Sequence, residues 1–379
     1  MPRMELETIT TQLSPSETIR YARHLSMRSI GMAGQKRLLA SKVLVVGAGG
    51  LGSPALMYLA AAGIGTIGII DDDYVDITNL QRQVIHRTHD IGASKVESAA
   101  RFIQDINPEL AIIEHKIRLT DKNALEIIEG YDCVVDASDN FSTRYLVNDA
   151  CVLLNKPCIW GSVYQFTGQV SVFWSEYGPC YRCLFPEPPP KEYAPSCSQG
   201  GVVGAICGVV GAIQSAEVVK LAVGNGDSLI GRMWLFDGEA GQSVIVSIPR
   251  NPSCPSCSKR ETKEILEVPE TSCHIERMSL PSIEPMELDA VMKASQLDRP
   301  RIALFDIRNE YEWASGHIPG ANLVGPDWVE NPIVPDNTDE IIIYCESGVR
   351  SATALERLIA RGIHVKHLNG GLQEWRRFH

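Results

Sequence analysis

Two pairs of cysteines stand at the spacing that a metal ion requires. Cys180 and Cys183 enclose two residues, and Cys254 and Cys257 enclose two others. This spacing lets both sulfurs of a pair face one ion, and four thiolates form a closed tetrahedral zinc site. A redox-active pair is the main alternative, and two separate pairs of buried thiols are another. We expect structural Zn²⁺ on all four sulfurs, because a Cys₄ site leaves no open position for a substrate.

A fifth cysteine, Cys345, follows the apolar run 341–344 and precedes a predicted helix. A thiolate at the start of a helix is stabilised by the helix dipole and by loop N–H groups, and Arg350 adds a positive charge. Such a cysteine is a nucleophile that can carry a persulfide. The predicted persulfide loop consists of six consecutive residues: Cys345, Glu346, Ser347, Gly348, Val349 and Arg350.

A sixth cysteine, Cys197, lies in a loop rich in proline and glycine, residues 186–201. Most free cysteines fill space in a core, and we interpret Cys133, Cys151, Cys158 and Cys207 in this way. A polar, glycine-rich loop is an unusual place for a core residue. We therefore predict a chemical role for Cys197 and assign none to Cys273.

A glycine-rich loop follows the first apolar run of the chain. Residues 43–46 are followed by Gly-Ala-Gly-Gly-Leu-Gly at 47–52, and a helix is predicted from Pro54. Such glycines let backbone N–H groups approach an anion, and the helix directs its positive dipole end at the same point. Asp71 ends the next apolar run, where a carboxylate can hold ribose hydroxyls. Alone, the pattern favours an NAD or FAD enzyme, and it also fits a turn without a ligand.

Charged residues after this loop indicate a triphosphate instead. Arg82 and Lys95 follow the predicted ribose carboxylate. A triphosphate needs cations to offset its charge, whereas a hydride-transfer site does not; solvated surface charges are the alternative. Asp139 and Asn140 follow the buried run 133–135, at the sheet edge where ligands bind. A carboxylate there suits Mg²⁺, and this pair can also cap a helix.

Apolar runs and predicted helices alternate through the first part of the chain, which predicts an α/β fold with a Rossmann-like, doubly wound, mainly parallel sheet. Residues 14–40 and 205–223 are expected to be helical. Residues 258–282 mix charge and proline without a period. A second, small α/β unit follows. We expect a first domain at 1–258, a linker at 259–282 and a second domain at 283–379.

The bulk composition excludes some classes of protein. The chain has 379 residues, 44% hydrophobic and 21% charged, with a net charge of −11, which suits a globular protein of two or three domains and argues against nucleic acid or an anionic membrane as partner. The 11 cysteines, an odd number, argue against a disulfide scaffold. Residues 1–20 contain no signal-peptide core, and the apolar stretch 200–216 is shorter than the ~20 residues of a membrane span. We expect a cytoplasmic protein.

Five segments closely resemble the MoeB/ThiF family, bacterial relatives of ubiquitin-activating enzymes. They are RYARH at 20–24, GAGGLG at 47–52, IIDDDYVDITNLQRQ at 69–83, KVESA at 95–99 and DASDN at 136–140. The resemblance covers about residues 15–258. It implies ATP-dependent adenylation of the C-terminal carboxylate of a ubiquitin-like sulfur-carrier protein ending in Gly-Gly. It also implies zinc on the four paired cysteines, and a homodimer in which Arg23 reaches into the partner subunit's site.

The same resemblance assigns contacts with ATP or its Mg²⁺. The residues that it assigns are Gly50, Asp71, Thr78, Asn79, Leu80, Gln81, Arg82, Lys95, Asp139 and Asn140. Arg82, Asp139 and Arg23 are expected to take part in catalysis.

The C-terminal part resembles a rhodanese domain over about residues 283–379. FDIRNEYEWASGHIPGA at 305–321 resembles the rhodanese signature, and CESGVRS at 345–351 resembles the active loop. The resemblance implies that Cys345 takes sulfur from a persulfide or thiosulfate and that its terminal sulfur attacks the acyl adenylate. Cys197 is then expected to form a thioester or to release the thiocarboxylate through a disulfide with Cys345, in an order that the residues leave open. Molybdopterin biosynthesis is the first pathway to consider.

Three other functions remain open. An NAD- or FAD-dependent oxidoreductase would hold a dinucleotide and would not need Arg23 or Cys345. A docking protein without catalysis would not exchange pyrophosphate. An activating enzyme for protein conjugation would form a thioester on Cys197 and would be indifferent to Cys345.

Overall fold

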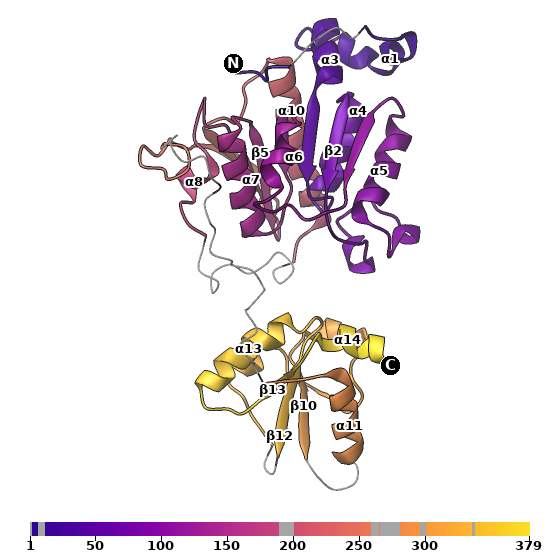
Figure 1. The fold of residues 1–379 in the computed structure, drawn as a ribbon, viewed down its shortest axis with the longest axis vertical. Helices are drawn as coiled ribbons and strands as arrows, with labels where there is room; N and C mark the ends of the chain where they lie inside the picture. The colour runs from indigo at the N-terminus through magenta and orange to yellow at the C-terminus, as the bar shows by residue number, and fades with distance from the viewer. Residues whose placement is uncertain are drawn as a thin grey trace. The chain divides into compact units, whose positions relative to one another are not determined.

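The computed structural model describes residues 2–6, 12–188, 201–258, 265, 281–295, 301–335 and 338–379. The chain forms two compact units, Met1–Thr271 and Ser272–His379, and Figure 1 shows the fold of each.

The first unit is built on an eight-stranded sheet in the order β3-β2-β1-β4-β5-β6-β7-β8. The first five strands in the chain are parallel to one another, and the last three extend the sheet in antiparallel pairing. The predicted mainly parallel sheet is therefore confirmed. The strands are β1 (Lys42–Val46), β2 (Thr66–Ile70), β3 (Ala111–His115), β4 (Cys133–Asp136), β5 (Cys158–Tyr164), β6 (Thr167–Phe173), β7 (Arg232–Asp237) and β8 (Gln242–Ser247).

Helices cover both faces of the parallel part of this sheet (Figure 1). Along β1, Val43 and Val45 face a core shared with one group of helices, and Leu44 and Val46 face a core shared with the other, because side chains alternate across a strand. The first group is α4 (Gly52–Ala62), α5 (Lys95–Ile106) and α10 (Gly204–Val223); the second is α6 (Ala124–Glu129) and α7 (Phe141–Leu153). Shorter elements are η1 (Ile77–Asn79), η2 (Thr88–Asp90) and α8 (Tyr181–Leu184).

The N-terminal segment, expected to be helical over 14–40, consists of three helices: α1 (Pro15–Arg20), α2 (Ala22–Leu25) and α3 (Gly31–Ala40). Ser14 and Glu17 form the capping box of α1. The chain turns away at Tyr21, whose buried hydroxyl accepts a hydrogen bond from Asn107 at 2.8 Å. A long-range anchor therefore interrupts a pattern that is helical by local preference.

Helix α10 is 20 residues long and apolar enough to cross a membrane, the one such helix within the described ranges. The helix continues beyond the apolar stretch 200–216 to Val223, in agreement with the helix expected at 205–223. More than half of its most apolar window, 56%, is buried inside the protein, and it packs against α4, β5 and β6. It has the surroundings of a core helix.

The second unit holds a five-stranded, fully parallel sheet in the order β11-β10-β12-β13-β9. Separate apolar clusters lie on its two faces, with Phe305 and Ile343 in one and Leu304 and Ile342 in the other. The strands are β9 (Ser282–Ile283), β10 (Ile302–Asp306), β11 (Asn322–Leu323), β12 (Glu340–Tyr344) and β13 (Lys366–Leu368). The helices are α11 (Pro285–Ser295), α12 (Glu310–Ala314), η4 (Pro326–Val329), α13 (Val349–Ala360) and α14 (Gly371–Phe378).

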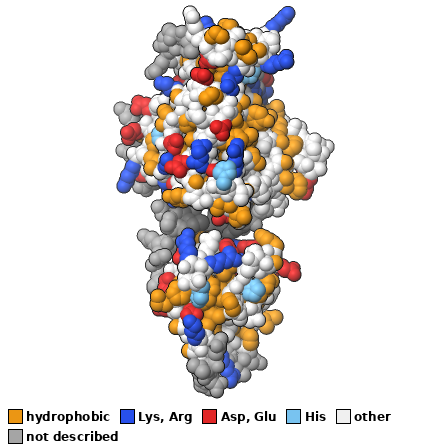
Figure 2. Space-filling view, turned by 90° about the vertical axis from the view of Figure 1, so that its right-hand side faces the viewer, with side chains coloured by type: hydrophobic (Ala, Val, Ile, Leu, Met, Phe, Trp, Pro, Cys, Tyr) orange, Lys and Arg blue, Asp and Glu red, His pale blue; other side chains and the backbone are white. Residues whose placement is uncertain are grey.

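The surface carries charges of both signs. Figure 2 shows Lys and Arg interspersed with Asp and Glu on the visible face of each unit, with hydrophobic side chains between them. A nucleic-acid-binding surface gathers positive charge on one face or stripe, and the face in view has no such arrangement.

Candidate functional site

The glycine-rich loop joins β1 to α4 at the middle of the parallel sheet. β1 lies between β2 and β4. The strand order therefore runs to one side of β1 for β2 and β3 and to the other side for β4 and β5. Parallel sheets bind their ligands at the carboxyl ends of the strands at such a switch point. Gly47 has a φ of +95°. A Cβ at Gly52 would lie 1.9 Å from the carbonyl oxygen of Gly47, and one at Gly50 would lie 3.1 Å from Cys207 Sγ. The loop is therefore too tight for side chains at these positions.

Asp71, the predicted ribose ligand, lies directly beside this loop. Its Oδ2 accepts a hydrogen bond from the N–H of Ala48 at 2.8 Å, and its Oδ1 accepts one from Asp73 at 2.9 Å. Burial raises the pKa of Asp71. Lys95, whose side chain is 8% exposed, forms an ion pair with Asp73 at 2.7 Å. The predicted carboxylate and cation thus lie at one edge of the loop.

The segment that follows β2 brings the other predicted residues to the loop. Arg82 donates to the carbonyl oxygen of Thr78 at 3.0 Å, and its side chain would lie 3.6 Å from a Cβ at Gly50. Asn79 accepts a hydrogen bond from the N–H of Asp76 at 3.2 Å. Leu80 and the exposed Gln81 complete the turn, which passes close to Gly204 at the start of α10.

Asp139 and Asn140 follow β4 on the other side of β1. The neighbouring Ala137 carbonyl would lie 3.0 Å from a Cβ at Gly47, so this turn is adjacent to the glycine-rich loop. Asn140 caps α7, because its Oδ1 accepts a hydrogen bond from the N–H of Thr143 at 2.9 Å. Asp139 is exposed, and its carboxylate is free to face solvent or an ion.

One residue beside the loop was not singled out in the sequence. The Nε2 atom of buried His86 lies 2.9 Å from the carbonyl oxygen of Ala48, and its Nδ1 lies 2.8 Å from Ser98 Oγ. Ser98 Oγ in turn lies 2.9 Å from Asp90 Oδ2. These partners are 38 and 12 residues from His86, so no local pattern indicates the contact.

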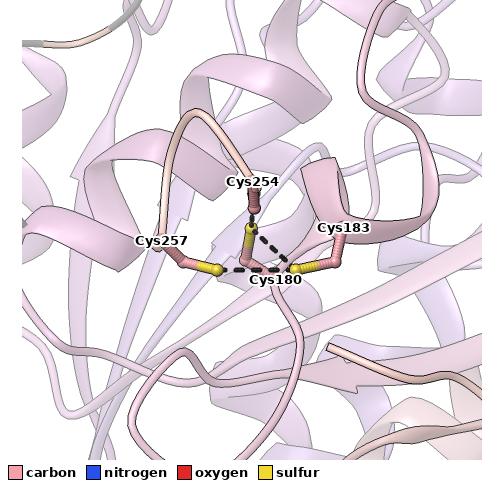
Figure 3. Close-up of side chains that lie close together, drawn as sticks. All are labelled: Cys180, Cys183, Cys254 and Cys257. Carbon is pink, nitrogen blue, oxygen red and sulfur yellow. Dashed lines mark hydrogen bonds between the residues drawn. The ribbon is translucent and has the colours of Figure 1, made fainter. Parts of the chain in front are cut away.

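The four paired cysteines meet in space (Figure 3). The Sγ atoms are 3.5 Å apart for Cys180 and Cys254, 3.4 Å for Cys183 and Cys257, and 4.0 Å for Cys180 and Cys183. All four sulfurs lie within 4.8 Å of one another. Zn–S bonds of 2.3 Å in a tetrahedron place sulfurs about 3.8 Å apart. The donor set and its spacing therefore fit one zinc ion.

A buried ion pair supports both halves of this cluster. Arg182, which lies between Cys180 and Cys183, donates to Asp149 of α7 at 2.8 Å from both Nε and Nη2. Ser256, which lies between Cys254 and Cys257, donates to the same carboxylate at 3.0 Å. Asp149 thus connects the two cysteine pairs through hydrogen bonds, an arrangement that the spacing of the cysteines did not reveal.

The persulfide loop joins β12 to α13 in the second unit. Cys345 is fully buried, and its Sγ accepts a hydrogen bond from the N–H of Ser351 at 3.4 Å. Gly348 has a φ of +83°. A Cβ at Gly371 would lie 2.4 Å from the carbonyl oxygen of Cys345, so a close backbone approach holds the loop. A sulfur here faces the N-terminus of a 12-residue helix, which stabilises a thiolate.

Each arginine around this loop is paired with a carboxylate. Arg350 donates twice to Glu312, at 2.9 and 2.5 Å. Glu346 accepts from fully buried Arg308 at 2.5 Å, and Arg308 also binds Asp306. Glu312 raises the pKa of Arg350 through these hydrogen bonds. The ion pairs fix the positions of Glu346 and Arg350, with exposed Ser347 and Val349 between them.

Two predicted site residues, Arg23 and Cys197, and the unassigned Cys273 are not part of these clusters. Arg23 is exposed on α2 and does not belong to the segment between β1 and α4 that forms the glycine-rich loop. Cys197 and Cys273 lie outside the described residues. The four cysteines interpreted as core residues, Cys133, Cys151, Cys158 and Cys207, are buried.

Comparison with known proteins agrees with both units. The ThiF family matches residues 21–256, and the rhodanese-like domain matches residues 289–378. The chain is 42% identical over 375 residues to the probable adenylyltransferase/sulfurtransferase MoeZ of Mycobacterium tuberculosis, covering 96% of this chain and 94% of that protein.

Two further relatives and one solved structure extend the comparison. Adenylyltransferase and sulfurtransferase MOCS3 of Anopheles gambiae is 40% identical over 394 residues, covering 96% of this chain and 88% of that protein. The sulfur carrier protein adenylyltransferase of Thermus thermophilus is 47% identical over 262 residues, covering 68% and 97%. The crystal structure of E. coli MccB with ATP matches with a TM-score of 0.56 at 24% identity, covering 65% of this chain and 75% of that one, which supports the fold alone.

Proposed function

The chain belongs to the ThiF family and carries a rhodanese-like domain, and from this premise we propose that it converts the C-terminal carboxylate of a ubiquitin-like sulfur-carrier protein to a thiocarboxylate. The chain is an adenylyltransferase and a sulfurtransferase that uses ATP. The observation that carries the proposal is the presence in one chain of two prepared sites, the loop beside Asp71 and the thiol of Cys345.

The first step in this proposal is adenylation. A carboxylate is a poor electrophile, and its attack on the α-phosphate of ATP gives an acyl adenylate and pyrophosphate. The protein contributes position and charge. The N–H groups of the glycine-rich loop and the cations Arg82 and Lys95 would face the phosphates, and Asp71 would hold the ribose. Asp139, exposed at the adjacent turn, would hold Mg²⁺, whose charge offsets that of the phosphates.

The second step moves sulfur. In a persulfide donor, the Cys345 thiolate attacks the outer sulfur, the donor S–S bond breaks and the donor leaves as a thiolate. With thiosulfate, the leaving group is sulfite. The terminal sulfur on Cys345 then attacks the acyl carbon, and AMP leaves with the electron pair of the broken C–O bond. This gives an acyl disulfide between the carrier and Cys345.

The product is released when a thiolate attacks Cys345 Sγ and the carrier leaves as a thiocarboxylate. We assign this attack to Cys197, which leaves a Cys197–Cys345 disulfide for an external thiol to reduce. The alternative, in which Cys197 first forms a thioester with the carrier, gives the same product. No disulfide joins any two of the nine described cysteines, as expected in the reducing cytoplasm that we propose as its location.

Zinc on the four paired cysteines is proposed as a structural element. Hydrogen bonds within the cluster lower the pKa of the Cys183 and Cys254 thiols and raise that of the Cys180 thiol, and a bound cation favours the thiolate form of its ligands. Four sulfurs within 4.8 Å would repel one another as thiolates unless an ion lay between them. The ion would tie the segment after β6 to the segment after β8.

An exposed edge strand is the surface that we propose for the carrier. β8 ends the eight-stranded sheet, and Val244, Ile245 and Val246 on it are 55%, 53% and 39% exposed. Three consecutive exposed apolar residues on a sheet edge are a liability that a partner strand can cover. A ubiquitin-like carrier offers a sheet of its own. Molybdopterin biosynthesis is the pathway that we propose first.

A homodimer is also part of the proposal. A cavity of about 570 Å³ lined by His24, Met27, Tyr58 and Val219 opens next to α2, which also carries the exposed Arg23. Met27 and Tyr58 are 46% and 57% exposed. A second subunit that covered this apolar surface would bring Arg23 toward the nucleotide site of its neighbour, as the family resemblance implies.

Pyrophosphate exchange tests the adenylation step. Radiolabelled pyrophosphate should enter ATP only when a Gly-Gly-ending carrier is present, and Lys95→Ala should reduce the rate at least tenfold. Lys116→Ala is the matched control, because Lys116 also pairs with a carboxylate but its side chain is 45% exposed against 8% for Lys95. Equal effects of the two substitutions, or no exchange with any carrier, would contradict the proposal.

A further inference from the structure

Ala48, the second residue of the glycine-rich loop, forms hydrogen bonds through both its backbone N–H and its backbone carbonyl. The N–H of Ala48 donates to Asp71 Oδ2 at 2.8 Å, and the carbonyl oxygen of Ala48 lies 2.9 Å from His86 Nε2. A carbonyl oxygen only accepts hydrogen bonds, so the Nε2 atom carries a proton and donates it. Ala48 is itself fully buried.

His86 is fixed from its other side as well. Its Nδ1 lies 2.8 Å from Ser98 Oγ, which is 2.9 Å from Asp90 Oδ2. Asp90 forms an ion pair with Arg101 at 2.7 Å. His86, Ser98 and Asp90 are 5%, 2% and 5% exposed. The imidazole therefore has one orientation, set by a chain of hydrogen bonds that starts in α5 and ends at the loop.

The direction of one peptide group follows from this contact. In a trans peptide the C=O and the next N–H point to opposite sides. Because the carbonyl of Ala48 points toward the buried His86, the N–H of Gly49 points away from His86. Neither Gly49 nor Gly50 donates a backbone hydrogen bond within the part of the chain that the structure describes, so both N–H groups are available to an anion.

We propose that His86 is a positioning residue of the nucleotide site, which orients the peptide between Ala48 and Gly49 so that the N–H of Gly49 faces a phosphate of ATP. Preorganised donors of this kind contribute because they need no rearrangement when the anion binds. The inference rests on the proposed ATP-dependent adenylation and assigns it a further residue. His86 touches the loop and not the reacting atoms.

The test compares three substitutions by calorimetric titration with Mg-ATP on the full chain. His86→Leu removes the donor, and its dissociation constant for ATP should rise about tenfold, the loss expected for one oriented hydrogen bond. His86→Gln keeps an N–H near the place of Nε2 and should bind ATP within about threefold of wild type. Ser98→Ala leaves the imidazole in place but frees its orientation, and should lie between these two.

A second histidine supplies the control. His115 is also partly buried, and its ring binds the Tyr131 hydroxyl at 2.8 Å instead of the loop. His115→Leu should leave ATP affinity unchanged even where it lowers the melting temperature. In pyrophosphate exchange, His86→Leu should raise the KM for ATP and leave the KM for the carrier unchanged.

The outcomes separate this inference from the proposed function. If wild type and His86→Leu bind ATP equally, or if His86→Gln is as weak as His86→Leu, the positioning role is wrong. If His86→Leu does not fold, the comparison of His86→Gln and Ser98→Ala with wild type decides, and wild-type affinity in Ser98→Ala counts against the role. If wild type binds ATP but no carrier supports pyrophosphate exchange, the proposed function is wrong. The ATP affinities of the variants still test the positioning role of His86 in that case.

Discussion

Removal of the Asp149 carboxylate should weaken the whole cysteine cluster. Asp149 and Arg182 are 2% and 6% exposed in their side chains and lie 2.8 Å apart. Asp149→Ala would leave the Arg182 guanidinium buried without its carboxylate and would also remove the acceptor of Ser256. Breaking a buried pair from one side costs about 3–5 kcal/mol. Because 1 kcal/mol changes the melting temperature of a domain of this size by ~2–4 °C, we expect a decrease of roughly 6–20 °C.

The same substitution should loosen the proposed zinc ion. Groups that orient metal ligands typically change metal affinity by about 10–100-fold, so a chromogenic chelator should remove zinc faster from Asp149→Ala than from wild type. Asp227→Ala is the control, because Asp227 also pairs with an arginine, at 2.9 Å, but its side chain is 91% exposed. Such pairs contribute about 0–1 kcal/mol. If Asp149→Ala melts and releases metal like Asp227→Ala, the proposed support of the cluster by Asp149 is refuted.

Three other predictions concern the loops. Cys345→Ala should abolish sulfur transfer and leave carrier-dependent pyrophosphate exchange unchanged. Loss of both activities would contradict the proposal that adenylation and sulfur transfer use separate sites. Burial raises the pKa of Glu312, but the hydrogen bonds from Arg350 and the other contacts of this carboxylate together lower it by more, so that the pKa lies below the usual value of 4.5. The ion pair therefore stabilises the fold fully above pH 4.5, and this stabilisation is lost as the pH falls through the lowered pKa. Glu312→Gln should therefore cost about 1–2 kcal/mol at neutral pH, and melting temperatures of both proteins should converge on acidification; a constant difference would count against the pair. Gly52→Ala places a Cβ 1.9 Å from a backbone carbonyl oxygen and should weaken ATP binding at least tenfold. Gly208→Ala, whose added Cβ has no atom within 4 Å among the described residues outside its own helix, should bind ATP like wild type.

The parallel part of the fold could be predicted because local patterns determine it. Short apolar runs separated by helices over residues 43–160 specify βα units, and the glycines at 47–52 mark the turn at the centre of the sheet. β8 was not predicted, because its residues are exposed on both faces and lack the alternation of a half-buried strand. The break at Tyr21 was missed because it depends on Asn107, which is 86 residues away.

Some residues of the candidate site could likewise be predicted from the sequence, and others could not. Residues with a distinctive type and spacing, such as the paired cysteines and Cys345, could be identified from the sequence, and the structure brings the four paired sulfurs together. His86 and Asp149 could not, because a buried histidine or aspartate has no local signature and their partners are up to 107 residues distant. Chemistry that depends on short motifs is visible in the sequence, whereas the groups that orient those motifs become visible only in the fold.

Intact mass spectrometry of a set of Gly-Gly-ending carriers tests the central claim most directly. Each carrier is incubated with Mg-ATP, a sulfur donor and either wild type, Cys345→Ala or Cys197→Ala. The account predicts that one carrier exchanges one oxygen for sulfur with wild type and remains unchanged with Cys345→Ala, and that Cys197→Ala slows the release of the product. A carrier that gains sulfur equally with Cys345→Ala, or a full set that gains none and releases no pyrophosphate, would contradict it.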